Sequence, residues 1–175
     1  KTVSISLFVN YVDEIDLLGT QLLVREKYHD QFCHIVKKLI GQETFFIKKD
    51  IASKEDAINY LCDNLIQLGY ATQEYKEDVF KREEMAGTAF VQGFAVPHAL
   101  HTAIAFYYIR HGLKESVKWG KYEIRLILLL SISEQDNQML HTFFDWLSNV
   151  LIDYNQLMQF IEADNYQEFM KLMTA

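Results

Sequence analysis

The sequence predicts an α/β domain in which a mixed β-sheet is flanked by helices on both faces. Half of its 175 residues are hydrophobic and 23% are charged, as expected for a globular chain with a full core. Segments rich in β-branched and aromatic residues alternate with segments whose apolar residues recur every three or four positions. Alternation of this kind indicates strands packed between layers of helices.

The first 42 residues divide into two predicted parts. Residues 1–12 alternate apolar and polar side chains as a strand does, but a strand with no partner is not stable alone. Residues 13–42 have helical spacing, which runs through Ile15, Leu18, Leu22, Phe32, Ile35 and Leu39. We therefore expect residues 1–12 to end a preceding domain, residues 13–42 to form a helical connector, and residues 43–175 to form the main domain. We expect no residue before Gln42 in that domain's core, and we expect the chain, which begins with Lys1, to belong to a longer protein.

Capping patterns mark the first helices of the main domain. Ser53, with Asp56 three residues later, begins one helix, Gly69 ends it, and Thr72 begins the next. Helical spacing returns late in the chain, over Asp136–Leu151, Tyr154–Glu162 and Tyr166–Met173. Strand composition predicts the β-strands, which are Phe45–Ile47, Phe94–Val96, Thr102–Ile109 and Glu123–Ile132.

Pro97 is the only proline of the chain, and it directly precedes His98. Proline fixes its own φ angle, provides no N–H donor and biases Val96 toward an extended conformation, so the strand should end here. His98 would then lie on a stiff corner, where an imidazole can reach solvent or a partner and act as a nucleophile near neutral pH. The competing interpretation is an ordinary hydrogen-bonded histidine at the protein surface.

Composition and charge exclude several classes of function. The net charge is −7 and no basic arm is present, so this chain should make no direct contact with nucleic acid. The longest apolar run, Leu126–Leu130, is far too short to cross a membrane, and no signal peptide is recognisable. Cys33 and Cys62 lie on apolar helix faces without CxxC spacing, which predicts reduced core thiols and a cytoplasmic location.

Other types of reactive site are also disfavoured. His98 and His101 could begin a metal site, but residues three apart on an extended chain face opposite sides, and no third ligand has matching spacing. His111 is likewise not assigned to a metal site, so we expect no bound metal. We also expect no cofactor. The sequence contains no Gly-x-Ser-x-Gly motif, so a serine hydrolase is disfavoured. Trp119 and Trp146 are more simply explained as core aromatics than as a sugar-binding platform.

A longer sequence pattern surrounds His98. Its parts are Tyr75, Lys81-Arg82-Glu83-Glu84, Gly87-Thr88-Ala89-Phe90, Gly93-Phe94-Ala95-Val96-Pro97-His98, Leu68-Gly69-Tyr70, the Ser53-x-x-Asp56 cap and Leu147–Leu151. Together they resemble the mannitol/fructose class of enzyme IIA domains of the sugar phosphotransferase system, over about Phe45 to Met173. The leading segment, Val3–Phe8 followed by Asp13, resembles the end of the IIB-like domain that precedes an enzyme IIA domain in sugar-operon regulators with duplicated regulatory (PRD) domains. Such regulators are transcriptional activators or antiterminators.

The resemblance implies roles for two residues. In the family the histidine after the proline, here His98, accepts a phosphoryl group from the phosphocarrier protein HPr. Arg82 matches the family's arginine near that histidine, and its planar donors suit a phosphoryl group. Taken without the family, Arg82 is more simply an exposed helix residue paired with Glu83 or Glu84.

The sequence departs from the transport members of the family at two positions. They usually have glycine after the active histidine and a second active-site histidine at the start of the long helix, where this chain has Ala99 and Leu140. His141 is one residue away, which on a helix is a rotation of about 100°. A surface or boundary histidine is therefore the better interpretation of His141. Many regulator-type members lack the second histidine, so Leu140 favours regulation over sugar transport.

Two principal hypotheses for the function follow. In the first, the chain is a regulatory phosphoacceptor domain, not itself an enzyme, and phosphorylation of His98 by HPr changes contacts with neighbouring PRD or IIB-like domains. In the second, it is a transport enzyme IIA that passes the phosphoryl group to a IIB domain. A weaker third hypothesis is an interaction domain that is never phosphorylated. The apolar stripe of residues 13–42 also allows a second copy of the chain as a partner.

Overall fold

Three short strands form a mixed sheet in the structure, a computed structural model that describes residues 29–34, 36–37, 40–46, 51–99, 116–131 and 137–175. The strands are β1 (Ala89–Phe90), β2 (Phe94–Ala95) and β5 (Leu126–Ile127), in the order β1-β2-β5. β1 pairs antiparallel with β2, and β2 pairs parallel with β5. The expectation of a mixed sheet is therefore confirmed.

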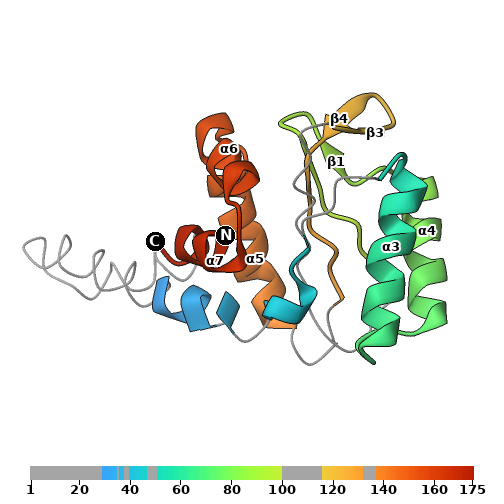
Figure 1. Ribbon diagram of the computed structural model, residues 1–175, viewed down its shortest axis with the longest axis horizontal. Helices are drawn as coiled ribbons and strands as arrows, with labels where there is room; N and C mark the ends of the chain where they lie inside the picture. Colours follow the sequence, from blue (N-terminus) through green and yellow to red (C-terminus); the bar gives the residue numbers. More distant parts are fainter. Residues whose placement is uncertain (1–28, 35, 38–39, 47–50, 100–115, 132–136) are drawn as a thin grey trace, which may run out of the picture.

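Helices cover both faces of this sheet, with α3 and α4 on one side and α5, α6 and α7 on the other (Figure 1). Successive side chains of a strand point to opposite faces, and two separate clusters of buried residues result. Phe94, Val96, Leu126, Leu128 and Leu130 belong to the cluster beneath α5–α7, whereas Ala95, Ile127 and Leu129 belong to the cluster beneath α3 and α4. The continuous apolar run Leu126–Leu130 is thus explained by burial on both faces.

The first helical layer begins at the predicted caps. α3 spans Lys54–Gln67, and the Ser53 hydroxyl accepts a hydrogen bond from the Asp56 N–H at 3.0 Å. α4 spans Gln73–Met85, and the Thr72 hydroxyl accepts from the Tyr75 N–H at 3.2 Å. Gly69 lies just after α3 with a φ of 77°, a conformation that glycine adopts without strain. These caps fix where α4 begins and therefore where its far end meets the sheet.

The second helical layer is built from the end of the chain. α5 spans Asn137–Val150, α6 spans Tyr154–Glu162 and α7 spans Tyr166–Met173, close to the predicted bounds. Side chains of Asp153 and Asn165 cap α6 and α7. Within the described residues, no helix is both long and apolar enough to cross a membrane.

The strands differ from the prediction more than the helices do. The predicted strand Glu123–Ile132 divides at Arg125, because Tyr122–Ile124 (β4) pairs with Val117–Trp119 (β3) in a separate hairpin whose turn contains Gly120 at a φ of 62°. β1 was not expected, and Phe45 and Phe46 follow a 3₁₀ turn, η1 (Gln42–Thr44), without forming a strand. The predicted strand Thr102–Ile109 lies outside the described residues.

Part of the predicted connector belongs to the core. Residues 29–34 and 36–37 are helical, as expected. Phe32, Val36 and Ile40 are all buried, and they join the same cluster as Phe94 and the side chains of α5–α7. Residues before Gln42 therefore do contribute to the core, contrary to expectation, because the side chains of these three residues pack into the cluster beneath α5–α7. The division of the chain at residue 42 remains a prediction.

Burial of Cys62 in α3 leads to a testable pH dependence. Burial raises the pKa of the Cys62 thiol to about 12, from an ordinary value of 9.0. Between these values the unfolded chain loses the thiol proton while the folded chain keeps it, so stability falls as pH rises. We expect the free energy of unfolding from urea titrations to decrease above pH ~9 by up to about 1.4 kcal/mol per pH unit from this group.

The matched variant for this experiment is Cys62→Ala, which removes the thiol and keeps a small apolar side chain at the site. Its stability should be lower at neutral pH because a cavity forms, but its decline between about pH 9 and about pH 10 should be shallower than that of the parent chain. Equal slopes in the two proteins would show that Cys62 does not cause the decline.

Candidate functional site

His98 lies three residues beyond the end of β2, on the corner predicted from Pro97. Its side chain is half-buried, and its Nδ1 is 2.8 Å from the carbonyl oxygen of Val96. A carbonyl oxygen can only accept a hydrogen bond, so Nδ1 must carry the proton. In the neutral ring the lone pair is then on Nε2, which is the nitrogen available to a partner.

Backbone hydrogen bonds fix the corner to the neighbouring strand segment. His98 forms a parallel bridge with Leu130, and the Leu130 N–H donates to the Pro97 carbonyl oxygen at 2.9 Å. Pro97 can still accept a hydrogen bond although it cannot donate one. The backbone that carries the imidazole is therefore fixed, on the side facing β5, by its hydrogen bond with Leu130.

The other side of His98 is approached by the end of α4. Val96 donates its N–H to the Thr88 carbonyl oxygen at 3.1 Å, which continues the β1–β2 register. Extrapolated two residues further, this register places Ala86 opposite His98. Ala86 is extended, with φ −162° and ψ 123°, although the structure forms no bridge between these two residues. We call His98, its bridge partner Leu130 and the extrapolated position Ala86 the His98 row.

Arg82 is bound to this row. Its side chain is half-buried, and its Nη1 donates to the Ala86 carbonyl oxygen at 2.5 Å. Among the described residues it forms no ion pair with Glu83 or Glu84, in contrast to the simple surface interpretation. A guanidinium has five N–H donors, and one is used here. The structure thus places both predicted site residues at the same end of the sheet.

Glu83 is a residue that the sequence did not single out as part of the site. It is buried, and its carboxylate accepts hydrogen bonds from the backbone N–H of Thr88 at 3.2 Å, from the Thr88 hydroxyl, and from Trp119 Nε1 at 2.9 Å. These contacts hold the segment that leads from α4 into β1, and with it Ala86. The position of this carboxylate next to Arg82 could have suggested a role in the site. Nothing in the sequence indicates that Thr88 and Trp119 would donate hydrogen bonds to it.

This arrangement can receive a phosphoryl group. It offers a neutral nitrogen nucleophile on a backbone held from both sides, with a guanidinium nearby to bind anionic oxygens. No group of three metal-binding side chains occurs within the described residues. Four positions discussed for the site, His101, His111 and the side chains of Leu140 and His141, lie outside the described part of the chain.

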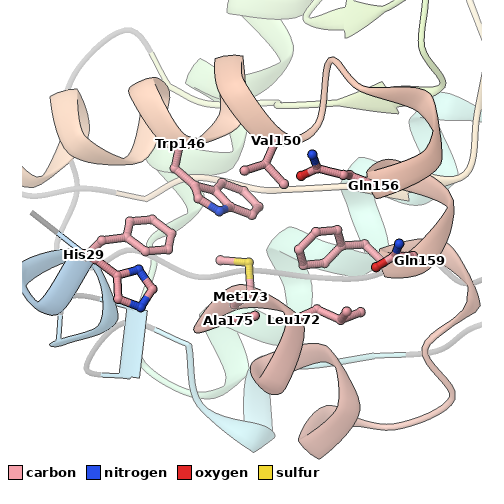
Figure 2. Close-up of a pocket in the computed structure, with 10 residues that line it drawn as sticks. His29, Trp146, Val150, Gln156, Gln159, Leu172, Met173 and Ala175 are labelled. Carbon is pink, nitrogen blue, oxygen red and sulfur yellow. The ribbon is translucent and has the colours of Figure 1, made fainter. Parts of the chain in front are cut away.

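A separate pocket of about 350 Å³ lies in the α5–α7 layer, where the helical residues before Ile40 meet the end of the chain (Figure 2). Trp146 forms part of its wall, stacked on Phe32 at 5.5 Å and edge-on to Phe160 at 5.6 Å between ring centroids. His29 is the only ionisable side chain among its lining residues. A pocket without an arginine or a lysine is poorly suited to a phosphoryl group, so this pocket is not the candidate site.

The sequence profile described as "Phosphoenolpyruvate-dependent sugar phosphotransferase system, EIIA 2" matches residues 38–175. The chain belongs to this family. The expected fold class is confirmed by the crystal structure of IIA mannitol from Escherichia coli, which superposes with a TM-score of 0.63 and 22% identity. This similarity covers 76% of the present chain and 97% of the IIA mannitol chain.

Relatives with curated descriptions include a regulator and a phosphoryl transfer protein. The "Probable licABCH operon regulator" of Bacillus subtilis is 28% identical over 133 residues, which cover 75% of this chain and 21% of the regulator. "Multiphosphoryl transfer protein 1" of Escherichia coli is 28% identical over 145 residues, covering 79% of this chain and 17% of that protein. The EIIA chain therefore spans about a fifth of the length of these relatives.

Proposed function

We propose that this EIIA domain is the regulatory phosphoacceptor of a sugar-operon regulator, and that His98 receives the phosphoryl group from HPr. The observation that carries the proposal is the Nδ1 hydrogen bond to Val96, which leaves Nε2 as the nucleophile. Two further features support it. The Arg82 guanidinium is attached to the His98 row, and the neighbouring Met85 side chain is 72% exposed, which provides an apolar contact for a protein partner.

The proposed transfer balances without any added group. The Nε2 lone pair of His98 forms a new P–N bond while the P–N bond of the donor's phosphohistidine breaks. The donor ring carries a proton on its other nitrogen, so it keeps the released electron pair and leaves as a neutral imidazole, and the His98 ring becomes a phosphorylated imidazolium. Nδ1 keeps its proton and its bond to Val96, so the ring does not need to turn. Arg82 stabilises the charge on the phosphoryl oxygens during transfer. The product is an acid-labile phosphohistidine.

Regulation and sugar transport remain distinct versions of this proposal. Leu140 at the position of the second histidine and the likeness to an operon regulator support regulation. The likeness to the IIA mannitol fold supports transport, in which a IIB domain would take the phosphoryl group from His98. In the regulatory version the added negative charge changes contacts with neighbouring PRD or IIB-like domains.

The test of the proposed function is incubation of the chain with phosphoenolpyruvate, enzyme I and HPr. Mass spectrometry should detect one added phosphoryl group that is lost in acid and survives in alkali. Addition of a IIB domain then separates the two versions, because rapid loss of the group to IIB indicates transport and retention indicates regulation. No phosphorylation with active HPr would instead indicate the interaction domain.

Substitution of Arg82 should slow the transfer. Arg82→Ala removes a charge-assisted contact of about 1.5–3 kcal/mol, so we expect the rate of transfer from phosphorylated HPr to fall about 10- to 100-fold. The matched control is Lys81→Ala, since Lys81 is exposed and bonds only to Asp78 among the described residues. Equal rates for the Arg82 and Lys81 variants would assign Arg82 to the surface.

A further inference from the structure

Tyr75 is a buried polar residue that the proposed mechanism does not yet use. It lies in the first turn of α4 and is 3% exposed, and its hydroxyl donates to the Leu130 carbonyl oxygen at 2.7 Å. Leu130 is the member of the His98 row on the β5 side. The same residue therefore accepts from Tyr75 through its carbonyl and donates to Pro97 through its N–H.

Tyr75 and Arg82 project from the same side of α4. Residues seven apart on a helix differ in direction by only about 20° and in height by about 10 Å. The buried Val79 lies between them on this stripe. Tyr75 bonds to the Leu130 carbonyl and Arg82 bonds to the Ala86 carbonyl, so one helix holds both ends of the row that has His98 at its centre.

We infer that Tyr75 is a positioning residue for His98, which acts by fixing the Leu130 carbonyl and, through the Leu130–Pro97 hydrogen bond, the backbone that carries the imidazole. This inference rests on the proposed role of His98. Tyr75 does not contact the phosphoryl group. Its contribution is to hold Nε2 in line for transfer, because a small displacement of a nucleophile has a large effect on the rate.

The surroundings of Tyr75 favour a protonated hydroxyl that can donate a hydrogen bond. Burial raises the pKa of the Tyr75 phenol well above its ordinary value, and nearby Cys62 adds to the rise, so the burial of this residue favours the protonated, hydrogen-bond-donating form. The neighbouring Ser131 side chain acts in the opposite direction and lowers that pKa. The hydroxyl proton is donated to the Leu130 carbonyl oxygen.

The chain offers a matched control in Tyr166. Its hydroxyl donates to the Ile40 carbonyl oxygen, also at 2.7 Å, in the layer of α7. Tyr75→Phe and Tyr166→Phe each remove one hydroxyl and one such hydrogen bond, but only the first touches the His98 row. Both variants are compared in the full chain for the rate of transfer from phosphorylated HPr and for the His98 side-chain ¹H–¹⁵N resonances of the unphosphorylated protein.

We expect Tyr75→Phe to transfer about tenfold more slowly and to shift the His98 resonances, while Tyr166→Phe leaves both unchanged. Replacing Tyr75 by 4-aminophenylalanine, which restores a weaker donor, should give an intermediate rate and an intermediate shift. If Tyr75→Phe does not fold, the 4-aminophenylalanine variant tests the positioning role instead. His98 resonances of that variant identical to those of the parent chain would overturn the inference. A lower melting temperature in Tyr75→Phe without either change would overturn it as well.

The two readouts separate this inference from the proposed function. If the parent chain is not phosphorylated, the proposed function fails, but the His98 resonances still report whether Tyr75 positions the ring. If the parent chain is phosphorylated and Tyr75→Phe matches it in rate and resonances, the proposed function stands and the positioning role is overturned.

Discussion

His98→Ala should abolish the phosphoryl adduct that the proposed transfer from HPr would place on this EIIA domain. The substitution removes Nε2, the nitrogen left with a lone pair by the Nδ1 bond to Val96, and no remaining group of the His98 row is a nucleophile. The loss should be complete within detection, whereas removal of a supporting contact only slows the reaction. Mass spectrometry after incubation with phosphoenolpyruvate, enzyme I and HPr gives the measurement.

Two controls make this result specific to His98. His29→Ala changes an exposed histidine in the other layer and should leave the adduct unchanged. The melting temperature of His98→Ala should stay close to that of the parent chain, because the half-buried ring makes one hydrogen bond to the backbone. An adduct of equal size on His98→Ala would place the phosphoryl group on another residue.

Removing residues 1–41 should strongly destabilise the domain. The deletion takes away Phe32, Val36 and Ile40, each 5% exposed or less, and exposes the faces of α5–α7 that they cover. Each such side chain contributes about 1.5–3 kcal/mol when fully buried, so the loss is about 5 kcal/mol or more. Typical domains have a total stability of about 5–15 kcal/mol, and thermal melting followed by circular dichroism should show a large decrease.

A shorter deletion provides the control for this experiment. A chain that begins at His29 keeps the three buried residues as well as the hydrogen bond from the Tyr166 hydroxyl to the Ile40 carbonyl. It should melt near the temperature of the full chain. If the chain that begins at Gln42 melts there too, residues 29–41 add nothing to stability and the predicted boundary at residue 42 is correct.

Local chemistry made the helices of this fold predictable. The side chains of Ser53 and Thr72 cap helix starts, and Gly69 adopts the positive φ that favours a helix end. The structure has helices that begin and end at these residues. The strands were harder because each strand in the described part of the chain is only two or three residues long. A run such as Glu123–Ile132 has the composition of one strand, but Arg125 is where the chain passes from the β3–β4 hairpin to the central sheet, and that choice depends on distant partners.

In the candidate site, too, features set by neighbouring residues could be predicted, and contacts between distant residues could not. Pro97 and His98 are adjacent in sequence, so the corner could be predicted, and the family resemblance supplied Arg82. The contacts that hold the corner join residues far apart in the chain, as in the bonds of Tyr75 to Leu130 and of Trp119 to Glu83. Side-chain spacing gives no indication of such pairs, because they depend on how the layers pack.

The His98 row also affects when the protein becomes competent during its synthesis. Ala86 and His98 are synthesised before Leu130, which follows His98 by about 30 residues. At about 5–20 residues per second these residues take seconds to synthesise, and during that time the hydrogen bond from Leu130 to Pro97 cannot form. The backbone that carries His98 is therefore held on both sides only late in the synthesis of the domain.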